Sequence, residues 1–173
     1  MDTTYQTINI KEWKRKEHFN AYRNAVKCGF SLTFKLDISQ VIPFIKEQGY
    51  KFYPVMIYLL SKAANKHPEF RMAMKEGELI VWDRVDPVYT VLHSETETFS
   101  ALSSRYIEEL TKFIKAYDQT AEQHQHDYRF FPEKAPENHF NISAIPWINF
   151  SCLPTQLGLR KGNYRIYFFF KIG

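Results

Sequence analysis

The stretch from residue 50 to residue 100 constrains the fold most, because its hydrophobic pattern changes from helical to strand spacing partway along. Pro54 suits the first turn of a helix, where a missing backbone N–H costs nothing. Apolar residues then recur at helical spacing until Pro68 ends the pattern, which predicts an amphipathic helix facing a core. The expected apolar stripe consists of Val55, Leu59 and Ala63, with Met56, Leu60 and Ala64 beside it.

The second half of this stretch has the signals of strands and tight turns. Residues 71–75 and 79–83 flank Glu76-Gly77, a pair that is typical of a hairpin turn. The residues from Tyr89 to Ser100 predict one further strand. A helix, a hairpin and a strand therefore follow one another in a short piece of chain.

Helical and strand patterns also alternate on the N-terminal side. Apolar residues recur at helical spacing from Lys11 to Val26, and residues 30–36 alternate between apolar and polar, which predicts a half-buried strand. A capping box that starts at Asp37 predicts a helix ending at Gly49. Pro43 lies inside that range, so its first part can also form a separate turn.

The same alternation continues on the C-terminal side. Ser104 is expected to cap a helix that is supported by Glu108 and Lys112, four residues apart. Residues 139–150 predict a strand, and Pro146 indicates an edge position or a bulge. The regular exchange of helices and strands indicates a single α/β domain built in layers.

Composition narrows the classes of partner. Aromatic residues make up 17% of the chain, with 15 Phe and 11 Tyr, which suits a large core, an apolar pocket or a subunit interface. The formal charge of +4 is spread along the chain without a basic run, so nucleic-acid binding has little support. The mild positive charge also suits an anionic cofactor, although only weakly.

Cysteine and histidine spacing gives no metal motif. Cys28 and Cys152 do not form a Cys-x-x-Cys pair, so we expect buried, reduced thiols. His124 and His126 lie close together, but no third ligand is placed by spacing, so we expect no bound metal. The N-terminus lacks the features of a signal peptide and no apolar run approaches membrane-spanning length, which favours a soluble, cytoplasmic protein.

One polar pair stands out on the strand from His139. Alternation places Asn141 and Ser143 on one face and Phe140 and Ile142 on the other. Two such side chains could donate hydrogen bonds to an oxyanion that develops in a transition state. Spacing alone favours the plainer alternative, in which they satisfy groups of the strand or of a nearby turn.

Several longer segments carry a resemblance to a known family. They are Lys51-Phe52-Tyr53-Pro54, Phe70-Arg71-Met72-Ala73-Met74, Val81-Trp82-Asp83, Glu95-Thr96-Glu97-Thr98-Phe99-Ser100, and Asn141-Ile142-Ser143-Ala144 followed by Pro146-Trp147. From about residue 11 to about residue 150 the chain resembles the chloramphenicol acetyltransferase family. The resemblance implies an α/β two-layer sandwich with a mixed β-sheet and helices mainly on one face. It also implies a homotrimer whose active sites lie at subunit boundaries.

The resemblance also implies a reaction and a set of site residues. The family transfers an acetyl group from acetyl-CoA to a hydroxyl of chloramphenicol, and Ser143 matches the serine that hydrogen-bonds the tetrahedral intermediate. Arg15 matches an arginine with a structural role, paired with an aspartate near the catalytic histidine. The substrate-binding positions implied by the resemblance are Ala21, Tyr22, Val26, Cys28, Phe30, Val88, Thr90, Phe99, Phe131 and Asn141. Ala21 and Val88 differ from the residue types common at these family positions.

The resemblance weakens after residue 150. Family members supply a general-base histidine from a His-His-x-x-x-Asp-Gly motif, and none of the six histidines here lies in such a context. We therefore expect one acetyltransferase-like domain over residues 1–173, with a divergent tail at 151–173 and a truncated or frame-altered end. Either acetyl transfer is impaired, or the chain is a catalytically dead remnant that at most binds chloramphenicol or a full-length homologue. His18 and His93 are the substitutes to consider for the missing base, although the sequence favours the plainer alternative that each is a surface histidine or a satisfied core histidine.

Overall fold

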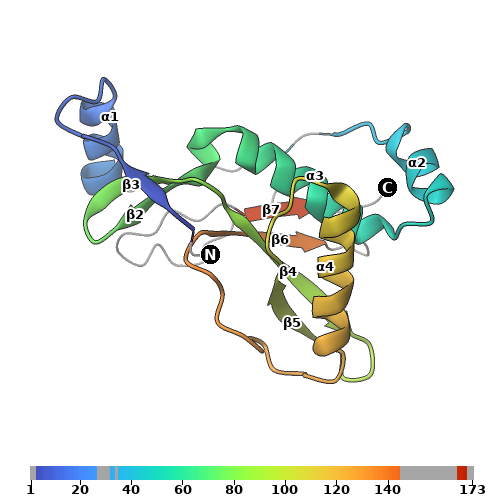
Figure 1. Cartoon of the computed structure of the whole chain (residues 1–173). Helices are drawn as coiled ribbons and strands as arrows, with labels where there is room; N and C mark the ends of the chain where they lie inside the picture. The colour runs from blue at the N-terminus through green and yellow to red at the C-terminus, as the bar shows by residue number, and fades with distance from the viewer. Residues whose placement is uncertain (1–2, 27–31, 34, 145–166, 171–173) are drawn as a thin grey trace.

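The structure, a computed structural model, describes residues 3–26, 32–33, 35–144 and 167–170. Its helices and strands alternate along the chain, as Figure 1 shows. In order they are β1 (Tyr5–Thr7), α1 (Lys16–Asn20), the π-helical turn η1 (Ala21–Val26), α2 (Val41–Glu47), α3 (Phe52–Lys66), the 3₁₀ turn η2 (Pro68–Arg71), β2 (Met72–Lys75), β3 (Glu78–Trp82), β4 (Asp86–His93), β5 (Thr98–Ser103), α4 (Leu110–Gln123), β6 (His139–Ala144) and β7 (Tyr167–Phe170).

Two sheets organise these elements. The larger has the order β5-β4-β6-β7, with β4 antiparallel to β5 and β6 parallel to both β4 and β7. The smaller is antiparallel in the order β1-β3-β2. Buried residues of α3 and α4 share one core with those of β4, β5 and β6, so both helices lie on one face of the larger sheet. The expected α/β sandwich with a mixed sheet is confirmed.

A group of tyrosines forms part of this core. The ring of Tyr89 lies 4.9 Å from that of Tyr117 and 6.4 Å from that of Tyr53, measured between centroids. Burial raises the pKa of Tyr53 to about 12, although its bond to Thr90 acts the other way. Burial also raises the pKa values of Tyr89 and Tyr117. A neutral hydroxyl is retained in the fold at a pH where an exposed tyrosine ionises.

These shifts predict a loss of stability in alkali. Above pH 10 the unfolded chain releases its tyrosine protons while the folded chain keeps them, so stability falls as pH rises toward the folded pKa. From pH 8 to pH 11 the unfolding free energy of the wild type should fall, and in Tyr53→Phe this fall should be smaller by about 1 kcal/mol. Urea unfolding at the two pH values measures this. An equal loss in both proteins would mean that Tyr53 is not held neutral.

The expected helix at Pro54 is confirmed as α3, but its buried stripe is rotated. Leu59 and Ala63 are exposed, whereas Ile57, Ser61 and Ala64 are buried. Ser61 was not part of the predicted apolar stripe. Its hydroxyl can be buried because it donates to the Ile57 carbonyl at 2.7 Å.

The hairpin at Glu76-Gly77 is confirmed as β2–β3. Both turn residues have positive φ, 52° and 88°, as a two-residue turn between twisted strands requires. The single strand expected from Tyr89 to Ser100 is wrong, because β4 and β5 pair across a turn near Glu97, which also has positive φ at 53°. Polar turn residues interrupt a run that is otherwise rich in strand formers.

Two N-terminal expectations need correction. The described residues of the 30–36 segment have no strand conformation, and Leu32 and Leu36 are exposed because no described strand pairs with them. Asp37 does not cap a helix; its carboxylate accepts the backbone N–H of Ser39 at 2.9 Å in a local turn. Helix α2 therefore begins at Val41, which leaves Pro43 within its first turn.

The C-terminal half also differs from the pattern. Helix α4 begins at Leu110, not near Ser104, and Lys112 pairs with Glu109 at 2.7 Å instead of Glu108. Strand β6 lies between β4 and β7, so the expected edge position is wrong; Pro146 is outside the described residues.

Candidate active site

The face of the larger sheet opposite α3 and α4 carries five of the expected site residues: Val88, Thr90, Phe99, Asn141 and Ser143. On β6, Phe140 and Ile142 are buried in the core that α3 and α4 share. The intervening residues Asn141 and Ser143 therefore lie on the opposite face. In-register pairing places Val88 beside Asn141. The polar pair predicted from alternation is confirmed as two residues on one face, opposite the side that α3 and α4 cover.

Ser143 is held by a hydroxyl on the next strand. Its Oγ lies 3.1 Å from the Oγ1 of Thr90. Thr90 is itself anchored, because the Tyr53 hydroxyl of α3 donates to its carbonyl at 3.0 Å. When Thr90 donates to Ser143, the Ser143 hydroxyl keeps its own hydrogen for another acceptor. This is the arrangement that a donor to a developing oxyanion needs.

Asn141 brings an unused donor to the same face. Its side-chain nitrogen is buried and has no hydrogen-bond partner among the described residues. Leaving a buried amide unpaired costs roughly 1–3 kcal/mol, so a bound molecule with an acceptor would gain by meeting it. Asn141 therefore fits a binding position better than a purely structural one.

Aromatic side chains gather where β5 meets the connection between α4 and β6. Phe99 is 46% exposed and its ring lies 5.2 Å from that of Phe130, which in turn lies 4.2 Å from Phe131. A cavity of about 350 Å³ opens here, lined by Glu97, Thr98, Phe99, Tyr128 and Phe130. Sequence reasoning missed Phe130, although the Phe-Phe-Pro run that contains it was visible.

Other expected site residues lie elsewhere. Ala21, Tyr22 and Val26 belong to η1 and are exposed. Figure 1 shows α1 beside β2 and β3, at the end of the molecule away from α4. Arg15, exposed, precedes α1. The structure does not bring these residues to Ser143, and Cys28 and Phe30 are outside the described residues.

No histidine takes the place of a base beside Ser143 in the described part of the chain. His93 is buried and its Nε2 lies 2.8 Å from the Oγ of Ser100, not from Ser143. His18 is exposed on α1. His139 bonds the Pro136 carbonyl through Nδ1, and His124 bonds Glu133 at 3.1 Å.

Within residues 3–26, 32–33, 35–144 and 167–170, no three His, Cys, Asp or Glu side chains gather as a metal site would need. None of the helices described is both long enough and apolar enough to cross a bilayer.

Comparisons with known proteins identify the family of this chain. A family model described as chloramphenicol acetyltransferase matches residues 3–171, and so extends into the segment 151–173. Chloramphenicol acetyltransferase 2 of Escherichia coli is 55% identical over 147 residues, 84% of this chain and 69% of that protein. Chloramphenicol acetyltransferase 3 of Escherichia coli is 48% identical over 165 residues, 95% of this chain and 76% of that protein.

A solved chloramphenicol acetyltransferase structure shares the fold, with a TM-score of 0.76 over 95% of this chain and 77% of the other, at 22% identity. The family match covers nearly the whole sequence, and the relatives exceed the identity at which homology is secure. This chain belongs to the chloramphenicol acetyltransferase family.

Proposed function

We propose that this chain binds chloramphenicol on the face of its larger sheet opposite α3 and α4 and acetylates a hydroxyl of the antibiotic with acetyl-CoA. The observation that carries the proposal is the hydroxyl of Ser143, the match of the family serine, held at 3.1 Å from Thr90. Names of relatives at 44–55% identity support the substrate and the reaction class.

In this proposal the acceptor hydroxyl attacks the thioester carbonyl, and coenzyme A leaves as its thiol after gaining a proton. Ser143 donates a hydrogen bond to the carbonyl oxygen as negative charge develops on it. Asn141, Val88, Thr90, Phe99 and Phe131 line the acceptor pocket. The resemblance adds Ala21, Tyr22, Val26, Cys28 and Phe30 to the pocket and gives Arg15 a structural role, although within one chain η1 lies away from Ser143.

The proposal includes slow turnover. The six histidines of the sequence lie outside any His-His-x-x-x-Asp-Gly motif, so no residue is assigned to take the proton of the acceptor hydroxyl. General-base catalysis contributes about 10²–10⁴-fold to such reactions, so its loss leaves a rate that depends on Ser143 and on positioning.

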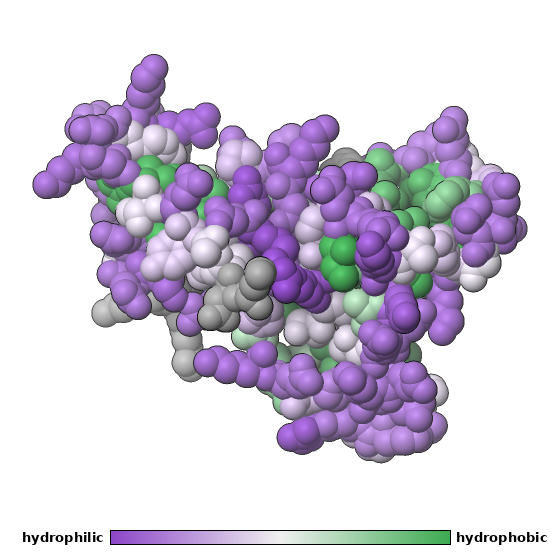
Figure 2. Space-filling model, viewed as in Figure 1, coloured by the Kyte–Doolittle hydropathy of each residue, from purple (hydrophilic) through white to green (hydrophobic). Residues whose placement is uncertain are grey.

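A homotrimer is part of the same proposal. Apolar side chains lie exposed on several N-terminal elements: Tyr22, Val26, Leu32, Leu36 and Phe44. Figure 2 shows hydrophobic surface gathered around α2. Contiguous exposed apolar surface marks sites of protein association.

A reaction that consumes acetyl-CoA also favours a cytoplasmic location.

Chloramphenicol-dependent release of thiol from acetyl-CoA tests the activity, using the purified 173-residue chain with its intact mass confirmed. We expect release above the blank, with kcat about 100-fold or more below that of the 55%-identical Escherichia coli relative assayed alongside. A chain that is folded, yet neither binds chloramphenicol nor releases thiol, would refute the proposal.

A second candidate is a binding protein without turnover, favoured by the absence of the histidine motif. It predicts binding of chloramphenicol in equilibrium dialysis without thiol release. It further predicts that the chain assembles with the Escherichia coli relative, which co-purification through a tag on one partner would detect.

A further inference from the structure

Ser100 is the centre of a buried hydrogen-bond cluster on β5. Its side chain is fully buried, and its Oγ lies 2.6 Å from the Arg129 carbonyl, 3.1 Å from the Asp127 carbonyl and 2.8 Å from the Nε2 of His93. A hydroxyl has one hydrogen, and a carbonyl can only accept. Ser100 therefore donates its hydrogen mainly to the nearer Arg129 carbonyl and shares it with that of Asp127, while His93 donates to Ser100 through an N–H at Nε2.

This cluster fastens residues 127–131 to the β4–β5 hairpin. Beside it, the backbone N–H of Ala101 donates to the Phe130 carbonyl at 2.7 Å. The ring of Tyr128 lies 5.1 Å from that of His93, and its hydroxyl donates to Glu95 at 2.8 Å. The segment is thus held at two successive carbonyls, those of Arg129 and Phe130.

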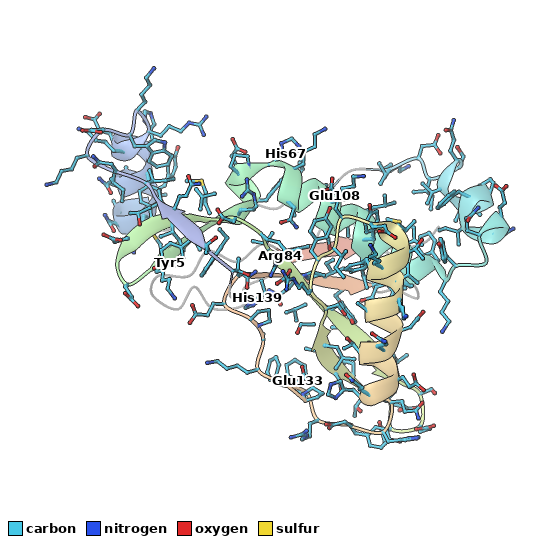
Figure 3. All side chains as sticks on the ribbon, in the orientation of Figure 1. Tyr5, His67, Arg84, Glu108, Glu133 and His139 are labelled. Carbon is cyan, nitrogen blue, oxygen red and sulfur yellow. The ribbon has the colours of Figure 1, made fainter. Side chains whose placement is uncertain are left out.

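A separate bond joins the residues that flank this segment on either side. His124 bonds Glu133 at 3.1 Å, and Figure 3 shows Glu133 near the C-terminal end of α4. The Arg129 side chain pairs with Asp127 within the segment itself, so it does not bind the segment to the hairpin. Ser100 and His93 provide the buried side-chain hydrogen bonds to β5 and β4, beside the ring contact of Phe130 with Phe99 and the Tyr128–Glu95 bond.

The segment that Ser100 holds carries two phenylalanines of the aromatic group beside Phe99. Phe130 and Phe131 follow Arg129 directly, and Phe130 packs on Phe99, the neighbour of Ser100 in sequence. We propose that Ser100, oriented by His93, is a positioning residue that sets the place of Phe130 and Phe131 and so determines affinity for the acceptor. This proposal rests on the proposed function, in which Phe99 and Phe131 line the acceptor pocket.

The size of the expected effect depends on how many molecules keep the segment attached. If the segment is detached in most molecules, the apparent Kd for chloramphenicol equals the intrinsic Kd divided by the fraction of molecules that still hold both phenylalanines in place. Ser100→Ala should therefore raise the Kd for chloramphenicol about tenfold while the KM for acetyl-CoA stays unchanged. A loss of overall stability would not separate the two substrates in this way.

Four variants and three measurements test the proposal, the measurements being the Kd for chloramphenicol, the KM for acetyl-CoA and the rate of tryptic cleavage. Ser100→Ala removes the hydroxyl, His93→Leu removes the N–H donor, and His93→Gln restores a donor near the Nε2 position. Ser104→Ala is the matched control, because Ser104 is also buried but bonds Tyr89 and Thr120 on the helix side. Chloramphenicol binding by equilibrium dialysis is measured beside the rate of tryptic cleavage after Arg129.

The Arg129–Phe130 bond is protected while both of its flanking carbonyls are engaged. We expect Ser100→Ala to speed its cleavage about tenfold, His93→Leu to speed it less, and His93→Gln and Ser104→Ala to stay near the wild type. Cleavage and Kd unchanged in Ser100→Ala would overturn the proposal. If the wild type does not bind chloramphenicol at all, the proposed function and the acceptor role fall together, while cleavage still decides whether Ser100 holds the segment.

Discussion

Replacing Ser143 by alanine should lower kcat for chloramphenicol acetylation about 100-fold or more, while the Kd for chloramphenicol changes little. The reason is that the serine hydroxyl acts on charge that exists only in the transition state, so its loss raises the barrier without weakening the ground-state complex. The measurement is saturating thiol release by wild type and Ser143→Ala at equal protein concentration, with equilibrium dialysis for Kd.

Thr90→Val is the companion variant, because it keeps the shape of the side chain and removes the hydroxyl that holds Ser143 at 3.1 Å. One neutral hydrogen bond is worth about 1 kcal/mol, so we expect a loss of roughly tenfold or less. A kcat in Ser143→Ala equal to that of the wild type would mean that the reacting carbonyl lies elsewhere. A parallel rise in Kd would assign Ser143 to binding instead.

Sequence alone could predict the parts of this site that depend on the alternation of side chains along one strand. Alternation along β6 placed Asn141 and Ser143 on one face, and the structure agrees because Phe140 and Ile142 point into the core. The Glu76-Gly77 hairpin was equally predictable, since only a few residue types adopt positive φ easily.

The parts that could not be predicted depend on contacts between distant segments. No spacing rule joins Thr90 to Ser143, 53 residues later, or Ser100 to the Arg129 carbonyl. The first bond follows from the parallel pairing of β4 with β6 and the second from the packing of the α4–β6 connection on β5, neither of which local patterns specify. Phe130 was missed for the same reason, because its contact with Phe99 is a property of the folded connection.

The two helix starts that were predicted wrongly, at Ser104 and Asp37, have a common cause. Ser104 and Asp37 both have the chemistry of helix caps, yet each uses its side chain for another contact. Ser104 bonds Tyr89 at 2.7 Å in the core, and Asp37 closes a turn on Ser39. A capping residue predicts a helix start only where no tertiary partner or tighter turn competes for its oxygen.

Replacing Asp86 by alanine should cost roughly 3–5 kcal/mol of unfolding free energy, the largest stability effect we expect from a polar substitution. Asp86 is 5% exposed, and its carboxylate accepts from Arg84 at 2.8 Å, from the Tyr106 N–H at 2.8 Å and from Asn138 at 3.1 Å. Alanine would leave a half-buried guanidinium and a buried amide without this acceptor.

Asp83→Ala is the matched control, because Asp83 is a nearby carboxylate that is exposed and bonds Thr4. We expect it to cost at most about 1 kcal/mol, as surface pairs do. Urea unfolding of both variants, with equal m-values, gives the comparison. A cost for Asp86→Ala no greater than that for Asp83→Ala would show that water satisfies the stranded groups.

The Asp86 cluster also has a consequence for the site. Asp86 pairs with His139 where β4 and β6 begin, its backbone N–H donates to the Asn138 carbonyl at 2.8 Å, and Figure 3 shows Arg84 and His139 together at this junction. A slip of one residue between β4 and β6 would turn Ser143 to the helix side of the sheet. Asp86→Ala should therefore weaken chloramphenicol binding even in the fraction that stays folded, whereas Asp83→Ala should leave it unchanged. Equilibrium dialysis at a temperature where both variants are folded distinguishes a loss of register from a loss of stability alone.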